Sequence, residues 1–334
     1  MKKERCLALL SGGLDSTLAV KTILDQDIDV AAINFITPFC NCTGRSSGCK
    51  HQASMVAEQL GIEIKVKFKG MEYVEIIKNP VYGYGKNMNP CVDCRIFMHR
   101  EAKKVMEEIG ASFLITGEVL GQRPMSQRRD TLRIIERDSG LEGLIVRPLS
   151  AKLFPPTIPE LKGIIDRNRL LAISGRSRRQ QIDAADSYGL NGYLCAAGGC
   201  LLTDINYSKK IRDLFKYEKS YNMTDIKLLK IGRHFRINEM TKVILGRKQE
   251  ENDMLNNLKK EREHFISPVN FPGPAALIKG NLDSEILDII TGLILHYSKP
   301  VAGDPYLEHQ LNRNKSEFKG TKRSVEREIE EYRI

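Results

Sequence analysis

A glycine-rich turn near the start of the chain has the residue types of a phosphate-binding loop. Residues 6–10 form a short apolar run, and the residues that follow are small, polar or acidic: Ser11, Gly12, Gly13, Asp15, Ser16 and Thr17. Adjacent glycines let backbone N–H groups approach a ligand, and a strand–turn–helix arrangement puts that ligand at a helix N-terminus. No Gly-Lys-Ser/Thr follows, so this is not a Walker A loop. The alternative interpretation is an ordinary glycine-rich turn.

Cysteines form a second group of residues that could do chemistry. Cys91-Val-Asp-Cys94 follows Asn89-Pro90 at the start of a predicted helix, and Cys200 follows two glycines farther along the chain. The helix dipole and the basic residues that come next would lower the pKa values of the two helix thiols. A Cys-x-x-Cys pair alone serves redox, zinc or iron–sulfur chemistry, so the pair does not choose among these.

A third group lies after the second predicted strand. It has the ligand types and the number of a tetrahedral structural zinc site, namely Cys40, Cys42, Cys49 and His51. We therefore predict a Zn²⁺ site here. The alternatives are unliganded thiols in a loop beside the active site, or thiols with a second role in sulfur relay.

Alternating strands and helices are expected to position these groups. Apolar runs predict strands at residues 6–10, 29–37, 63–69, 111–118 and 141–149, with helices between them. This order predicts an α/β fold with a doubly wound, mainly parallel sheet over residues 1–203. Ligands of such sheets bind at the carboxyl ends of the strands, where the glycine-rich turn lies.

The remaining segments differ in character. Residues 123–179 are rich in arginine, and phosphate contacts with RNA are predicted at Arg128, Arg129, Arg176, Arg178 and Arg179. Residues 204–311 read as a smaller C-terminal α+β domain, with strands at 228–232, 235–237, 241–246 and 275–279 and helices at 250–264 and 282–297. Residues 312–334 read as a charged tail.

Charge and hydropathy limit the partners. The formal net charge of the 334 residues is +10, which favours a polyanionic partner. No signal peptide and no membrane-length apolar run is visible, so we expect a cytoplasmic protein without a membrane partner. In that reducing compartment its eight cysteines are expected to be metal ligands, catalytic thiols or core residues rather than disulfides.

The motifs together resemble a known enzyme family. Ser11-Gly12-Gly13-x-Asp15-Ser16 resembles the PP-loop of ATP pyrophosphatases, which cleave ATP to AMP and pyrophosphate. With Asn-Pro-Cys-x-x-Cys, Ile-Thr-Gly-Glu118, Arg147-Pro-Leu and Gly-Gly-Cys200, residues 5–203 resemble the tRNA thiolation branch, the 2-thiouridine and 4-thiouridine synthetases. The Lys-Ile-Gly-Arg-His-Phe-Arg-Ile stretch resembles an RNA-binding module of ribosome quality-control proteins.

The resemblance implies roles for single residues. The PP-loop residues would hold ATP, with Asp15 on Mg²⁺. The residues at the following strand ends would complete the ATP site and its chemistry: Asn34, Phe35, Gly117, Glu118 and Arg147. Arg147 would stabilise the adenylated intermediate or, alternatively, pair with an acid in the core. Cys91, Cys94 and Cys200 would bind a [4Fe–4S] cluster, with Cys195 as the competitor for the third place.

The activity implied is ATP-dependent tRNA thiolation. A uridine carbonyl oxygen, C2 or C4, would be adenylated and then replaced by sulfur from sulfide or a sulfur donor protein. A persulfide route that uses two cysteines stays open, as does a homodimer. The long N-terminal RNA-capturing domains of 4-thiouridine synthetases are not seen before the PP-loop, so RNA binding is expected from the C-terminal side. The alternative functions are a PP-loop sulfurtransferase or amide ligase acting on a small molecule, and a non-catalytic RNA-binding factor.

Overall fold

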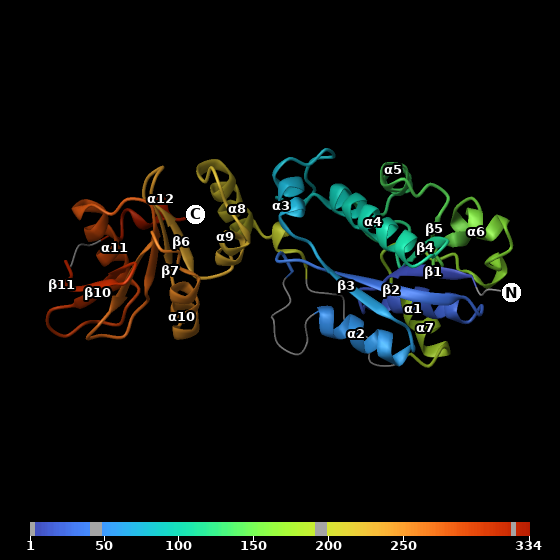
Figure 1. The fold of residues 1–334 in the computed structure, drawn as a ribbon, viewed down its shortest axis with the longest axis horizontal. Helices are drawn as coiled ribbons and strands as arrows, with labels where there is room; N and C mark the ends of the chain where they lie inside the picture. The colour runs from blue at the N-terminus through green and yellow to red at the C-terminus, as the bar shows by residue number, and fades with distance from the viewer. Residues whose placement is uncertain (1–3, 41–48, 191–198, 322–324) are drawn as a thin grey trace. The chain divides into compact units, whose positions relative to one another are not determined.

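The chain divides into two compact units, Met1–Thr203 and Asp204–Ile334, coloured blue to yellow-green and yellow to red in Figure 1. The computed structural model describes residues 4–40, 49–190, 199–321 and 325–334, and of residues 49 and 50 only the backbone. Each unit has its own sheet and its own hydrophobic cores.

The first unit is built on a parallel sheet. Within the described residues its strands are β1 (Arg5–Leu9), β2 (Asp29–Ile36), β3 (Ile64–Phe68), β4 (Phe113–Thr116) and β5 (Ile145–Val146), in the order β3-β2-β1-β4-β5. All neighbouring pairs are parallel, so the predicted doubly wound α/β fold is confirmed.

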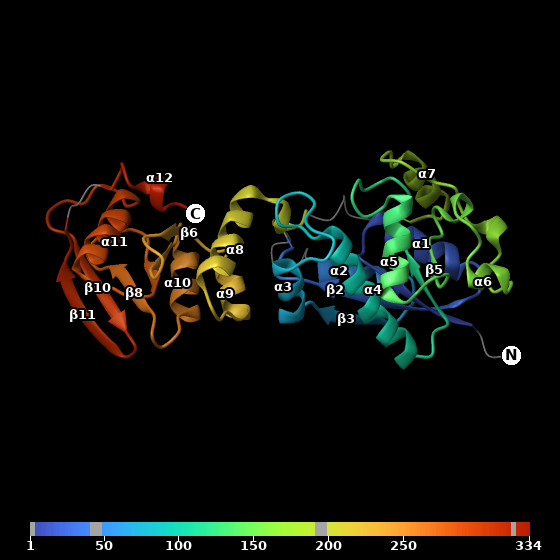
Figure 2. The same ribbon diagram turned by 90° about the horizontal axis from the view of Figure 1, so that it is seen from above.

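Helices cover both faces of this sheet. They are α1 (Leu14–Leu24), α2 (Cys49–Gln59), α3 (Met71–Lys78), α4 (Cys91–Glu108), α5 (Arg129–Ser139), α6 (Ile158–Leu161) and α7 (Arg179–Ser187). Both views show α3, α4 and α5 side by side (Figures 1 and 2). On β1, Cys6 and Ala8 pack into the core of α1 and α2, whereas Leu7 and Leu9 pack into the core of α4. A strand buried on both faces must be apolar throughout, which explains the continuous run at residues 6–10.

The strand order decides where a ligand can bind. From β1 the chain proceeds toward β2 on one side, and β4 returns on the other side of β1. The carboxyl ends of β1 and β4 are therefore the topological switch point, where open α/β sheets form a ligand crevice. The PP-loop follows β1, and Gly117-Glu118 follows β4.

One expectation for the first unit differs from the structure. The strand expected over residues 141–149 is limited to β5, because Gly143 has a positive φ of 70° and turns the chain just before it. The basic segment 123–179 contains buried apolar residues as well as arginines. Its helix α5 buries Leu132 and Ile135, so its arginines lie on one side of an amphipathic helix.

The second unit is an antiparallel α+β domain. Its described strands are β6 (Arg233–Arg236), β7 (Lys242–Leu245), β8 (His264–Pro268), β9 (Ala276–Lys279), β10 (Tyr306–Leu311) and β11 (Asn314–Lys319), in the order β11-β10-β8-β9-β7-β6. Its helices are α8 (Ile205–Tyr217), α9 (Met223–Leu228), α10 (Gln249–Leu258), α11 (Ser284–His296) and α12 (Ile329–Tyr332). The apolar face of α11 packs on the sheet.

Three expectations for this unit need correction. Residues 228–232 are the end of α9 and a turn rather than a strand, because Gly232 has a φ of 68°. The helix expected over 250–264 ends at Leu258, and β8 begins at His264. The residues set apart as a tail from 312 form β11 and α12, and Val325 and Ile329 enter the core. Their high charge reflects an edge strand with exposed side chains.

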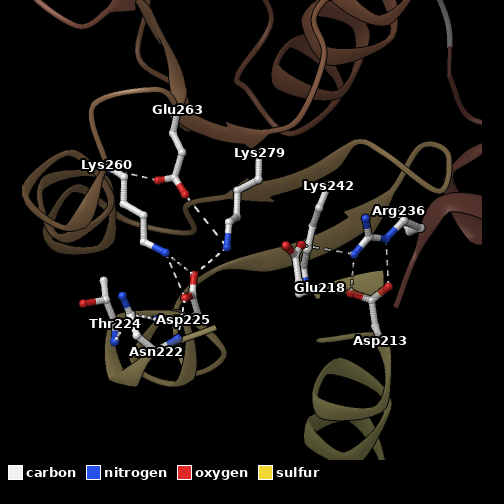
Figure 3. Close-up of polar contacts among 10 residues, drawn as sticks. All are labelled: Asp213, Glu218, Asn222, Thr224, Asp225, Arg236, Lys242, Lys260, Glu263 and Lys279. Carbon is white, nitrogen blue, oxygen red and sulfur yellow. Dashed lines mark hydrogen bonds and ion pairs between the residues drawn. The ribbon is translucent and has the colours of Figure 1, made fainter. Parts of the chain in front are cut away.

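Two buried carboxylates tie α8 and α9 to the sheet of the second unit (Figure 3). Asp213 of α8 accepts hydrogen bonds from Arg236 at 2.8 and 2.9 Å and from Lys242 at 2.6 Å. Asp225 of α9 pairs in the same way with Lys260 and Lys279. These contacts make α8 and α9 part of this unit.

Candidate nucleotide and cysteine site

The PP-loop presents the open N-terminus of a helix. Helix α1 starts at Leu14, and its first backbone hydrogen bond runs from Thr17 N to Gly13 O at 3.0 Å. The N–H groups of the first turn therefore have no acceptor within the helix, and the N-cap residue Gly13 supplies no side chain to cap them. Such an end, at the carboxyl end of β1, suits a phosphate group.

Close packing explains the glycines of this region. Gly12 has a φ of 78°, and a Cβ there would lie 2.8 Å from the backbone nitrogen of Ala53 on α2. A Cβ on Gly117 would lie 2.5 Å from the backbone nitrogen of Ser16. Helix α2 and the end of β4 thus press directly on the loop, and neither position has room for a side chain.

The loop's polar side chains hold its own shape. Ser16 Oγ accepts from Ser11 N at 3.2 Å and lies 3.0 Å from Ser11 Oγ, while Thr17 Oγ1 donates to Gly13 O at 3.0 Å. The N–H of Ser11, which the sequence analysis assigned to the nucleotide, is therefore used inside the loop. The first turn of α1 supplies the open N–H groups instead.

Asp15 lies at the start of α1 with an unused carboxylate oxygen. Its Oδ2 accepts from Gln122 at 3.2 Å and Arg178 at 3.3 Å, whereas its Oδ1 is buried without a partner among the described residues. A buried, unpaired carboxylate oxygen beside a phosphate-binding turn fits a Mg²⁺ ligand. Arg178, which is predicted to contact RNA, pairs with Asp15.

Arg123 interacts electrostatically with both the nucleotide loop and the cysteines. Desolvation and the charge of Arg95 lower the pKa of Arg123, whose other charged neighbours include Cys91, Asp15 and Arg178. Arg123 is exposed at the surface and close enough to Asp15 and Cys91 to interact with their charges. A cation there can stabilise negative charge that develops during phosphoryl or sulfur transfer.

Glu118 and Arg147 are partners of each other. The guanidinium of Arg147 donates to Glu118 at 3.2 Å and also pairs with Glu136, and Arg95 lies 3.6 Å from Glu118. Burial by itself would raise the pKa of Glu118, but the charges of Arg95 and Arg147 lower it. Arg147 thus pairs with core acids, as one of its two alternatives predicts, while its Nη2 has no hydrogen-bond partner among the described residues. Glu118 is likewise part of this buried network.

Of the two β2 residues predicted to complete the ATP site, Asn34 contacts the residue that precedes the loop. Asn34 is buried and donates to Leu10 O at 2.8 Å, and its Oδ1 has no partner among the described residues. Phe35 is half-buried and packs against the core under α4. An unpaired amide oxygen of this kind can accept a hydrogen bond from a base.

Cys91, Cys94 and Cys200 lie in one electrostatic neighbourhood, although they come from distant parts of the chain. Each of Cys91 and Cys94 influences the pKa of Cys200, and all three influence the pKa of Tyr73. Cys91 Sγ accepts from Asn89 Nδ2 at 3.0 Å, and Cys94 Sγ accepts from Lys69 Nζ at 3.1 Å.

The three thiols differ in acidity. Burial raises the pKa of Cys200 to about 11, and burial together with Cys94 raises the pKa of Cys91. Burial alone would also raise the pKa of Cys94, but the charge of Lys69 and the hydrogen bonds from Tyr73 and Lys69 lower it. Cys94 is therefore the most acidic of the three.

Lys69 and Tyr73 are functional candidates that the sequence analysis missed. Lys69 is 5% exposed and lies with its ammonium 4.6 Å from the centre of the Tyr73 ring. A sequence signal existed for Lys69, because it ends a strand, and strand ends carry the sites of parallel sheets. Nothing in the helical pattern of α3 singles out Tyr73.

The predicted zinc group is only partly described. Cys40 forms a β-bridge with Cys200, so this cysteine lies next to the thiol site, and His51 is exposed on α2. Cys42, the side chain of Cys49 and the competing Cys195 lie outside the described residues. Among the residues described, no three Cys, His, Asp or Glu side chains are grouped to hold a metal ion.

The other arginines predicted to bind RNA lie at the surface. Arg128 and Arg129 are exposed at the start of α5, and the Arg129 guanidinium lies 5.0 Å from the centre of the Phe154 ring. Arg176 and Arg179 are exposed just before and at the start of α7. In the part of the chain that is described, no helix is long and apolar enough to cross a membrane.

Two family models match the chain. Residues 1–152 match the thiamine biosynthesis protein (ThiI) family, and residues 232–333 match the NFACT protein RNA binding domain. The second match supports the resemblance noted for the C-terminal domain.

Curated relatives match the N-terminal unit. A tRNA-specific 2-thiouridylase of Leptospira interrogans is 25% identical over 202 residues, which are 54% of this chain and 53% of the relative. A tRNA sulfurtransferase of Shewanella amazonensis is 32% identical over 171 residues, 48% of this chain and 32% of the relative. The chain thus spans about a third to a half of the length of these relatives.

Solved structures align with lower scores. A 4-thiouridine synthetase–RNA complex with bound ATP aligns at a TM-score of 0.36 and 20% identity, covering 56% of this chain and 52% of that one. The U34-tRNA thiolase NcsA of Methanococcus maripaludis with its [4Fe–4S] cluster aligns at 0.36 and 17%, covering 69% and 72%. From the family model and the curated relatives, the resemblance of the N-terminal unit to the PP-loop enzymes of tRNA thiolation is confirmed.

Proposed function

We propose that this chain thiolates a tRNA uridine with ATP as the activating substrate, releasing AMP and pyrophosphate. One observation carries the proposal. The open N-terminus of α1 with the unpaired oxygen of Asp15 lies near a cluster of three thiols, and Arg123 is a charged neighbour of both. A phosphate site alone indicates ATP use, and thiols alone indicate sulfur or metal chemistry. Their proximity favours replacement of an activated oxygen by sulfur.

Each residue of the site would have its own role in this reaction. N–H groups of the first turn of α1 bind the phosphates, and Asp15 holds Mg²⁺ against them. The uridine carbonyl oxygen attacks the α-phosphorus of ATP and pyrophosphate leaves. Sulfide then adds to the activated carbon, and AMP departs with the original oxygen. Arg123 would stabilise the negative charge shared between phosphate and sulfur nucleophile.

The thiols fit a [4Fe–4S] cluster in their chemistry. Iron–sulfur clusters take thiolate ligands, and three thiols at Cys91, Cys94 and Cys200 leave one iron without a protein ligand. The thiolates that bind a four-iron cluster lie farther apart than the ligands of one metal ion. The described residues contain no group of side chains placed to bind one ion, and this does not argue against a cluster. When bound, the cluster would supply a site for the incoming sulfide. Lys69 would hold the thiolate form of Cys94.

RNA would be bound by arginines of the first unit and by the second unit. Arg128, Arg129, Arg176 and Arg179 are exposed cations that can contact phosphates, and residues 232–333 match an RNA-binding domain. Affinity for tRNA should then fall steeply with salt concentration.

The test measures AMP and thionucleosides together. The full chain, purified without oxygen, is incubated with ATP, Mg²⁺, sulfide and unmodified tRNA, and the nucleosides are analysed by mass spectrometry. We expect AMP formation to require tRNA, and Asp15→Asn to abolish it, whereas Glu58→Gln, an exposed residue of α2, leaves it unchanged. AMP formed equally well without RNA would favour the small-molecule alternative. Binding of tRNA without any AMP would favour the non-catalytic factor.

The cofactor is tested separately. Protein purified without oxygen should show visible iron–sulfur absorption that Cys91→Ala removes, while Cys6→Ala, in the buried strand β1, retains it. A colourless wild-type protein that still thiolates tRNA would favour the persulfide route. Metal analysis of the same sample tests the predicted Zn²⁺ site at Cys40, Cys42, Cys49 and His51.

A further inference from the structure

The segment of residues 79–90, here called the aromatic loop, forms hydrogen bonds with both segments that carry the thiols. The carboxylate of Asp93, between Cys91 and Cys94, accepts from Val81 N at 2.8 Å and from Tyr82 N at 3.1 Å. Near the other end of the loop, Gly85 N donates to Asn89 O at 2.9 Å. Asn89 in turn donates to the Cys91 thiol. The loop is thus fastened to the Cys-x-x-Cys turn at two points.

The same loop is fastened to the segment that carries the third thiol. Met88 N donates to Leu202 O at 3.0 Å, and Asn87 Nδ2 donates to Thr203 O at 2.7 Å. Cys200 lies just before these two acceptors. A segment held by this many hydrogen bonds at both thiol-bearing segments has a fixed position relative to the reacting sulfur.

The loop nevertheless exposes apolar surface. Val81 is 85% exposed, and the residues Tyr82 and Tyr84 are each more than a third exposed. Met125, also exposed, reaches over Gly85, since its Cγ would lie 3.3 Å from a Cβ at that glycine. Apolar side chains that gather at the surface mark a binding site more often than scattered ones do.

The two tyrosine rings are held by their hydroxyl groups. Tyr84 donates to Ile77 O at 2.7 Å, and Tyr82 donates to the carboxylate of Asp138. Arg137 donates to the Tyr82 oxygen at 3.3 Å. A ring whose hydroxyl group is already held in place loses little conformational entropy when a flat group stacks on it.

Cations lie near Tyr82 and within the loop. Arg137 and Arg100 lie beside Asp138, and Lys86 is an exposed residue of the loop itself. Aromatic faces interleaved with basic side chains suit unpaired RNA, because bases stack on the rings while phosphates meet the cations. A protein partner would need less positive charge around the apolar side chains.

We infer that the aromatic loop is a stacking platform for unpaired nucleobases next to the uridine that reacts. This inference rests on the proposed function and adds the residues that present the RNA to the thiols. A uridine must leave its stacked position to reach the site, and its neighbours then lose stacking partners. Tyr82, Tyr84 and Val81 would replace those partners.

The experiment measures binding without ATP, so that it does not depend on turnover. Fluorescence anisotropy of the full chain compares a labelled single-stranded RNA, unmodified tRNA and a duplex RNA of equal charge. Tyr82→Ala should weaken binding of the first two roughly 5- to 150-fold, the range for loss of one base–aromatic stack, and change duplex binding less than about twofold. Tyr82→Phe keeps the ring but loses the hydroxyl contacts to Asp138 and Arg137, so its affinity should lie between those of the wild type and Tyr82→Ala.

Two further variants keep the result interpretable. Val81→Ser changes a side chain that is almost wholly exposed, so the fold is retained, and it should weaken single-stranded binding about fivefold. Leu161→Ser, 73% exposed on α6, is the matched control and should leave binding unchanged. Equal losses on single-stranded and duplex RNA, or no loss in Tyr82→Ala and Val81→Ser, would overturn the platform. If the loop variants bind RNA normally but no longer accept sulfur from a donor protein, the platform is overturned and the loop is assigned to a protein partner.

These outcomes separate the platform from the proposed function. If wild-type protein binds single-stranded RNA through the loop but forms no AMP, the stacking platform is supported and the proposed thiolation activity is rejected. If wild-type protein forms thiolated tRNA and the loop variants bind RNA normally, the activity is supported and the platform is rejected.

Discussion

Removing the charge of Asp213 should destabilise the second unit strongly. In Asp213→Asn the carboxylate between Arg236 and Lys242 becomes a neutral amide. Arg236 keeps a second acid, Glu218, at 3.9 Å. Lys242, whose side chain is 3% exposed, loses the carboxylate that it pairs with among the described residues. Breaking one partner of a buried pair costs about 3–5 kcal/mol, because an uncompensated charge stays buried.

The assay is urea denaturation of the full chain followed by far-UV circular dichroism and tyrosine fluorescence, since the chain has no tryptophan. With a denaturant slope of about 2 kcal/mol/M, the midpoint of the second unit should fall by roughly 1.5–2.5 M. The control Glu330→Gln removes an exposed pair with Arg333 and should cost less than about 1 kcal/mol.

A double variant tests the cause. Asp213→Asn combined with Lys242→Met removes the stranded cation, so part of the lost stability should return. If Asp213→Asn shifts the midpoint no more than Glu330→Gln does, or if the double variant is less stable than Asp213→Asn, the charge argument for this site is wrong.

Three further predictions follow from the same structure. Burial raises the pKa values of Asp213 and Asp225, but their paired cations outweigh burial and lower both pKa values in the folded state. The stability that these carboxylates contribute should be complete above the unfolded carboxylate pKa of about 4 and be lost as the pH falls through the lower folded pKa. Urea midpoints measured from pH 2 to pH 7 test this. Gly12→Ala should abolish ATP binding measured by calorimetry, whereas Gly110→Ala, also at positive φ but with open space around it, should cost about 1 kcal/mol of stability and leave binding intact. In iron-free protein at neutral pH, Lys69→Met should slow alkylation of Cys94, because the lowered pKa of that thiol depends on the Lys69 ammonium. The control is Lys65→Met, an exposed position on β3, the strand that Lys69 follows; equal alkylation rates in the two variants would contradict the prediction.

The sequence by itself determined the sheet of the first unit and its nucleotide end. Short apolar runs that alternate with helical patterns indicate strands buried on two faces, and Ser11-Gly12-Gly13 indicates a turn where a ligand or another backbone approaches closely. Both signals are local, and both depend on residue type and spacing along a few residues. The position of the Cys-x-x-Cys pair at the start of α4 could be predicted for the same reason.

The tertiary structure decided which groups meet. Arg147 and Glu118 looked available for substrate, but β4 and β5 are neighbours and bring the two side chains together in the interior. Lys69 and Cys94 are far apart in sequence, and only the fold puts the ammonium 3.1 Å from the thiol. The same holds for Asp213 and Lys242, since a charge pair between distant segments leaves no periodic trace in the chain. Long-range pairing depends on packing of whole elements, which local propensity and spacing do not encode.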